Sequence, residues 1–167
     1  MQNMNFLWKL CVKPLQGKLI YRESEYSIDF IDYSEVEVER KTGNQGCTSL
    51  TIGTLQIEVG VESGKLLYPW GLYPLQHCES RELIIPTMLP GEIFVYLNNT
   101  KLIQGVAMDI PNINLWPAFR DPSTKWICIG DDELIGGITV IQFADNVAMA
   151  LRNDSLMSLW IKPVSEE

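Results

Sequence analysis

The sequence predicts an all-β or strongly β-dominated fold: an antiparallel sandwich, roll or partly open barrel, formed as a single domain over residues 1–167. Apolar and polar residues alternate with a period of two along most of the chain, and β-branched and aromatic residues are frequent in these stretches. No long stretch shows the 3.6-residue apolar period of an amphipathic helix. With 46% hydrophobic and 20% charged residues, 167 residues suffice for one compact core.

The N-terminal part predicts four strands followed by a turn rich in glycine at residues 42–46. Pro14 ends the first of these strands, and the fourth begins within the alternating run SEVEVE at residues 34–39. In chain order the four strands are expected at residues 6–12, 18–22, 26–33 and 35–41.

The middle of the chain contains the clearest predicted hairpin. It joins strands at residues 49–61 and 65–68 through residues 62–64, where Gly64 can adopt the positive φ that a tight turn requires. A proline-rich aromatic loop is expected next, at residues 69–74. It is followed by predicted strands at 83–85 and 92–98, and by an ambiguous stretch at 101–110 in which β-branched residues favour a strand.

The C-terminal part predicts a long irregular loop at residues 112–122 and then four strands. The last two strands are joined by a turn at residues 152–155. The strands are expected at residues 125–129, 137–143, 146–151 and 156–161. Their apolar side chains are expected in the core region: Trp126, Ile127, Ile129, Ile141, Phe143, Leu159 and Ile161.

Composition narrows the class of function. The formal net charge of −8 argues against nucleic-acid binding, which normally requires a basic surface. No apolar run approaches the roughly 20 residues that span a bilayer, and the N-terminus lacks the basic and apolar regions of a secretory signal. We therefore expect a cytoplasmic protein without membrane contact. Its four dispersed cysteines should stay reduced: Cys11, Cys47, Cys78 and Cys128.

Acidic residues are concentrated at one place in the chain. Seven carboxylates and no lysine or arginine occur between Glu23 and Glu39. In a strand, Glu35, Glu37 and Glu39 would share one face, where they could attract and hold a basic partner. The alternative is that this acidic stripe is only the solvated face of an ordinary strand.

Two aromatic loops supply the other candidate binding residues. Residues 68–74 contain Trp70 and Tyr73, and residues 115–120 contain Trp116. Tryptophan and tyrosine dominate protein interfaces, and they can also stack on a sugar or another planar ligand. The alternative is that these loops close the open ends of the β layers.

Candidates for catalysis are few. His77 is the only histidine, and its neighbour Cys78 would point to the opposite side of an extended chain, so the two cannot pair directly. The carboxylates at residues 131–133 follow a strand, but their spacing is not that of an EF-hand. We therefore expect no enzyme, no metal site and no cofactor, with a hydrolase that uses His77 or Cys78 as the alternative.

Three C-terminal segments carry a resemblance to known proteins. They are WICIGD at residues 126–131, QFA at 142–144 and SLWIKP at 158–163. Together they resemble the ending of small uncharacterised bacterial proteins, some of which are similar to immunity proteins of toxin systems. The resemblance implies a cytosolic, non-enzymatic inhibitor of a toxin.

The leading hypothesis is therefore a protein-binding module, an immunity protein that neutralises a basic bacterial toxin. In this hypothesis Glu35, Glu37 and Glu39 provide long-range attraction, while Trp70, Tyr73 and Trp116 are the buried anchors of the complex. A small-molecule or carbohydrate-binding β module that uses the aromatic loops is the second hypothesis.

Overall fold

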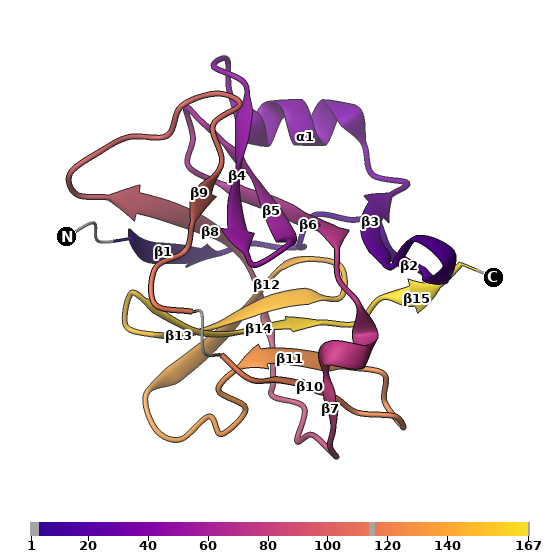
Figure 1. Ribbon diagram of the computed structural model, residues 1–167. Helices are drawn as coiled ribbons and strands as arrows, with labels where there is room; N and C mark the ends of the chain where they lie inside the picture. The colour runs from indigo at the N-terminus through magenta and orange to yellow at the C-terminus, as the bar shows by residue number, and fades with distance from the viewer. Residues whose placement is uncertain (1–3, 114–115, 167) are drawn as a thin grey trace.

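The computed structural model describes residues 4–113 and 116–166, and it confirms the β-dominated fold. Strands account for 51% of the described residues and helix for 9%. The strands form two mixed sheets that pack as a sandwich. Figure 1 shows mostly N-terminal strands in the upper part of the molecule and C-terminal strands in the lower part, with one helix, α1, at the top.

The larger sheet has eight strands in the order β1-β8-β12-β13-β14-β11-β10-β7. Neighbours are antiparallel except for the pairs β8–β12 and β7–β10, which are parallel. Its strands are β1 (Met4–Leu10), β7 (Glu79–Ser80), β8 (Leu89–Leu97), β10 (Ala118–Arg120), β11 (Ile127–Gly130), β12 (Ile138–Ala144), β13 (Val147–Arg152) and β14 (Ser155–Ile161).

The smaller sheet has seven strands in the order β15-β2-β3-β6-β5-β4-β9. Its two outermost pairs, β15–β2 and β4–β9, are parallel. Its strands are β2 (Lys18–Arg22), β3 (Ser27–Ile31), β4 (Cys47–Ile52), β5 (Leu55–Gly60), β6 (Leu66–Leu72), β9 (Met108–Asp109) and β15 (Val164–Ser165). The helical elements are α1 (Glu35–Thr42) and the short 3₁₀ turns η1 (Glu23–Glu25) and η2 (Leu75–His77).

Two apolar clusters stabilise the sandwich. The larger lies between the sheets and takes side chains from both, for example Phe30 of β3 and Ile141 of β12. The smaller lies on the other face of the eight-stranded sheet, around Trp160 and Phe119. Residues 147–151 of β13 are therefore buried on both faces, which explains their uninterrupted apolar run.

The predictions for the four C-terminal strands are confirmed to within two residues at both ends of each strand. β2 has the predicted bounds, and the turn at residues 152–155 joins β13 to β14, with Asn153 at a φ of 55°. Six of the seven predicted core side chains are buried, whereas Trp126 is partly buried against the smaller cluster. All four cysteines are free.

The strand predicted at residues 35–41 is wrong, because this segment is α1. The Ser34 side chain caps the helix by accepting a hydrogen bond from the backbone N–H of Glu37, at 3.2 Å. Acidic residues occupy the first turn, and Arg40 and Lys41 the last, which suits the helix dipole. The alternation does not reflect a buried strand face, since Val36 is 66% exposed.

Other predicted boundaries also differ from the structure. The segment 49–61 contains two strands, β4 and β5, with a turn between them, although the predicted hairpin at residues 62–64 is present. The predicted loop at 69–74 is largely strand, because β6 continues to Leu72. Residues 83–85 are not a strand. The predicted loop at 112–122 contains β10, and its residues 114–115 lie outside the described part of the chain.

Candidate functional site

The three glutamates predicted to form one acidic face are separated by the helix. Residues four apart lie on the same side of a helix, whereas residues two apart point to opposite sides, so Glu35 and Glu39 stay together while Glu37 turns away. Glu37 also binds Arg40 at 2.9 Å. The acidic face is therefore smaller than the sequence predicts, and the charge of Glu37 is neutralised by Arg40.

The predicted aromatic anchors do not lie together on one exposed surface. Trp70 lies in β6, where its indole N–H donates to a carboxylate oxygen of Glu58 at 2.9 Å. Tyr73 is only 9% exposed and belongs to the large core cluster, with its hydroxyl oxygen 3.5 Å from the Cys78 sulfur. Trp70 is thus partly accessible to a partner, whereas Tyr73 is buried in the core.

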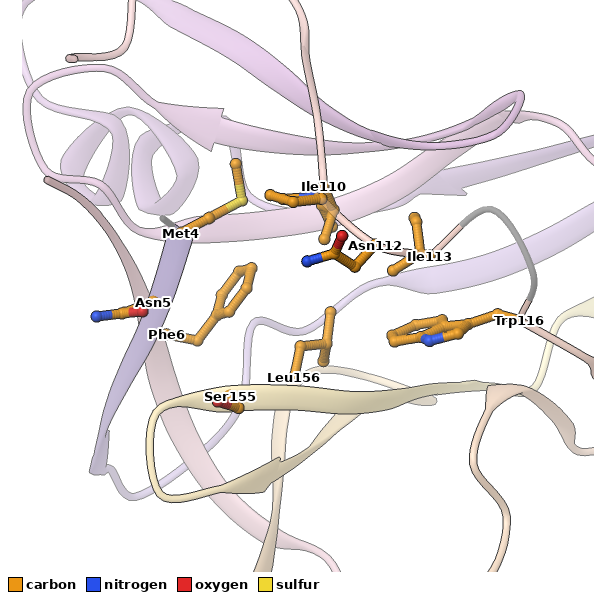
Figure 2. A pocket seen from close by; sticks show the side chains of 10 residues that line it. Met4, Asn5, Phe6, Ile110, Asn112, Ile113, Trp116, Ser155 and Leu156 are labelled. Atoms are coloured by element: carbon orange, nitrogen blue, oxygen red, sulfur yellow. The ribbon is translucent and has the colours of Figure 1, made fainter. Parts of the chain in front are cut away.

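Trp116 lines a cavity of about 280 Å³ between the start of β1 and the start of β14. Figure 2 shows its indole facing the same space as Phe6, Asn112 and Leu156. None of the described residues that line this cavity is charged, and its volume is at the lower limit of known ligand pockets, about 300 Å³. Its small size gives little support to the small-molecule hypothesis.

The two residues of the hydrolase alternative, His77 and Cys78, lie at the C-terminal end of η2. His77 is exposed at the end of η2. Burial raises the pKa of the Cys78 thiol and outweighs its hydrogen bond with Tyr73 and the charge of Arg120. A nucleophilic cysteine requires a lowered pKa, because the thiolate is the reactive form. Burial also raises the pKa of the Cys47 thiol.

A more distinctive feature lies beyond β7, where two connecting segments meet. Residues 81–88 follow β7, and residues 131–137 join β11 to β12. Between them is a groove of about 500 Å³, which we call the acidic groove. Its lining comprises Glu82, Ile84, Pro86, Asp132, Glu133, Leu134 and Ile135, which include three carboxylates.

The first segment is fixed by a buried carboxylate. Asp121 accepts hydrogen bonds from the backbone N–H groups of Leu83, Ser123 and Thr124, at 2.9, 2.8 and 3.2 Å. These donors, that of Leu83 foremost, hold the pKa of Asp121 below its ordinary value. Leu83 packs into the smaller core cluster, so the adjacent Ile84 side chain points outward.

The second segment is tied to the first by Arg81. Its guanidinium lies 3.8 Å from the centre of the Phe119 ring and donates to both carboxylate oxygens of Asp132, at 3.2 and 3.1 Å. The chain then turns so that the Ile135 carbonyl accepts a hydrogen bond from Arg152 at 3.0 Å. Both walls of the acidic groove are therefore held in place by specific contacts.

The groove presents unusually exposed apolar side chains. Ile84 is 91% exposed and Ile135 is 70% exposed, although each is attached to a backbone segment that packs against the core. Burying one such side chain contributes about 1.5–3 kcal/mol. Apolar side chains beside carboxylates can therefore bind a partner surface that combines apolar and basic groups.

Comparison with family models, curated proteins and solved structures finds no match to this chain. Within residues 4–113 and 116–166, no group of three or more histidine, cysteine, aspartate or glutamate side chains could hold a metal ion. No helix in those ranges is long and apolar enough to cross a bilayer.

The acidic groove was missed by the sequence analysis, although one signal pointed to it. The run ELIIP at residues 82–86 places three apolar side chains in succession before a proline. Whichever face of an extended segment is buried, Ile84 and Ile85 cannot both point to it. The partner segment could not be identified, because Arg81 and Asp132 are 51 residues apart in sequence.

Proposed function

We propose that this chain is a non-enzymatic module that binds a basic protein through the acidic groove and thereby inhibits it, as an immunity protein neutralises a toxin. The observation that carries the proposal is the pair of exposed isoleucines, Ile84 and Ile135, held beside the carboxylates of Glu82 and Glu133. A third carboxylate of the lining is paired with Arg81. Glu35, Glu39 and Trp70 do not line this groove and are then outside the proposed interface, and Tyr73 is a core residue.

The order of the groove supports a binding role. Association costs less conformational entropy when the segments that contact the partner are already held in place. Here the contacts of Asp121 and Arg81 fix the two segments before any partner arrives. The net charge of −8 adds long-range attraction for a basic protein, which increases the association rate at low ionic strength.

A capture experiment with matched baits tests the proposal. The tagged chain is incubated with lysate of its native host, and bound proteins are quantified by mass spectrometry. We expect a stoichiometric partner with a basic domain that is retained by the wild type and lost with the double variant Ile84→Ser/Ile135→Ser. Exposed positions tolerate such changes with little effect on stability, so this variant should stay folded.

Two controls separate the groove from other surfaces. Val12→Ser removes a 90% exposed apolar side chain elsewhere and should leave capture unchanged. The pair Glu82→Gln/Glu133→Gln should weaken capture, whereas Glu35→Gln/Glu39→Gln on α1 makes the same change in charge and should have little effect. Capture that is lost with the α1 pair and kept with the groove variants would contradict the proposal.

Inhibition is tested separately from binding. The captured partner is expressed in a bacterial host with either the wild-type chain or the double isoleucine variant. Growth should be restored only by the wild type. Equal growth with both forms, in the presence of a partner that is toxic alone, would show that the groove does not mediate neutralisation.

A further inference from the structure

The opposite edge of the eight-stranded sheet carries a second candidate surface. Within the part of the chain that the structure describes, β1 pairs only with β8, so its other side is a sheet edge. Along an antiparallel strand, the backbone groups of successive residues point alternately toward and away from the partner strand. The direction at any residue of β1 can therefore be deduced from two hydrogen bonds near its ends.

Those two hydrogen bonds give the same alternation of backbone directions along β1. The Phe6 N–H donates to the Asp154 carbonyl at 2.8 Å, away from β8, whereas the Cys11 N–H donates to the Pro90 carbonyl at 3.1 Å, toward the β8 side. Trp8 and Leu10 follow Phe6 at steps of two residues, so their backbone N–H and C=O groups also point away from β8. Among the described residues, no backbone partner lies opposite these groups of Trp8 and Leu10.

The side chains along this edge are mostly apolar and accessible. Leu7 and Leu10 are exposed, and Leu7 lies opposite Phe94 on the outer face of the β1–β8 pair. The neighbouring Tyr96 is exposed on that face as well. An apolar strand edge with open hydrogen-bonding groups is a template for pairing with another strand.

The charge at this edge is opposite to that of the chain as a whole. Lys9, Lys41 and Lys65 surround one carboxylate, Glu92, at 3.5, 2.7 and 3.3 Å. Lys9 is 62% exposed, and both Lys9 and Lys65 lie over the Phe94 ring. Lysine outnumbers carboxylate in this cluster, so an incoming strand with carboxylates would gain favourable contacts with Lys9.

We propose that the β1 edge binds an extended segment of another protein in which carboxylates alternate with apolar side chains, as an added strand paired with Trp8 and Leu10. A second copy of β1 is a poorer occupant. In an antiparallel pair in which Trp8 meets the second copy's Leu10, the two Lys9 side chains would lie directly opposite each other, and like charges in that position are destabilising.

This inference is independent of the acidic groove, and synthetic peptides test it. The probe is a blocked nonapeptide of alternating valine and glutamate, titrated into the ¹⁵N-labelled chain. We expect slowed hydrogen exchange at the amides of Trp8 and Leu10 and no change at Leu7, whose amide already faces β8. A valine–lysine peptide of the same length should bind at least about fivefold more weakly.

Two variants of the chain separate backbone pairing from charge. Leu10→Pro removes only an outward N–H, which an edge strand tolerates, and should weaken binding of the valine–glutamate peptide about tenfold. Lys9→Gln, which cannot disturb the β1–β8 hydrogen bonds, should weaken it about twofold to fivefold and reduce its salt dependence. A valine–glutamate peptide with alternate amides methylated should lose most of its affinity.

The inference would be overturned by any of three results. One is binding of the valine–glutamate peptide that is unchanged by Leu10→Pro, with circular dichroism showing that this variant is folded. Another is no protection at Trp8 and Leu10 at millimolar peptide. The third is a dimer in sedimentation velocity that Leu10→Pro dissociates, because the occupant would then be a second copy.

Discussion

Replacing Glu92 with glutamine should be among the most costly single changes in this protein that alter charge without altering size. The Glu92 carboxylate is 14% exposed and binds the ammonium of Lys41, itself 13% exposed, at 2.7 Å, which fastens α1 to β8. Burial alone would raise the pKa of Glu92, but hydrogen bonds and charges from Lys41 and Lys65 outweigh it and lower the pKa to about 2.

The expected magnitude follows from that pKa. A fall from the ordinary value of 4.5 to about 2 corresponds to about 3 kcal/mol of stability at pH 7. Because the folded-state pKa is the lower one, this stability is fully present above pH 4.5 and is lost as the pH falls toward 2. About 1 kcal/mol of it should remain at pH 3.

Urea unfolding of the wild type and of Glu92→Gln, followed by tryptophan fluorescence, measures this directly. The free energies of unfolding should differ by about 3 kcal/mol at pH 7 and by about 1 kcal/mol at pH 3. Glu37→Gln is the matched control, because its ion pair with Arg40 is similarly short, at 2.9 Å, but exposed, and should cost at most about 0.5 kcal/mol. A difference for Glu92→Gln that is small at pH 7, or independent of pH, would refute the reasoning.

Three further predictions concern stability and reactivity. Ser34→Ala should lower the free energy of unfolding by about 1 kcal/mol in urea titrations, since the N–H of Glu37 loses its cap; no loss would mean that the cap is not formed. Gly130→Ala should cost about 2 kcal/mol or more in the same assay, because φ is +117° and the added carbon would lie 2.6 Å from a backbone carbonyl oxygen; a neutral effect would contradict that close approach. Burial raises the pKa of the Cys128 thiol to about 12, so iodoacetamide at pH 8 should label it at least about tenfold more slowly in the folded chain than in urea. Equal labelling rates would place this thiol at the surface.

The elements that the sequence predicts well are those whose local pattern and tertiary environment agree. β2 and the C-terminal strands alternate or run apolar between clear turns, and they are buried on the expected faces. α1 was mistaken for a strand because EVEVE has a period of two. The SxxE spacing of Ser34 and Glu37, typical of a helix N-terminus, and the basic pair at its end were the better signals.

The candidate site was less predictable than the fold, for a physical reason. Glu35, Glu37 and Glu39 are neighbours in sequence, but their arrangement depends on the type of element, which the alternation misrepresented. The acidic groove depends instead on contacts between distant segments. Neither Ile84 nor Ile135 is distinctive alone, and only the fold brings the two segments together.

The most direct test of the proposed function is hydrogen–deuterium exchange of the chain with and without the captured basic partner. The account predicts slowed exchange at residues 82–86 and 131–135 in the complex, and no change along α1. The same two segments should exchange at unchanged rates when the partner is mixed with Ile84→Ser/Ile135→Ser. Protection confined to α1, or a complex that leaves both segments of the acidic groove unprotected, would contradict the central claim.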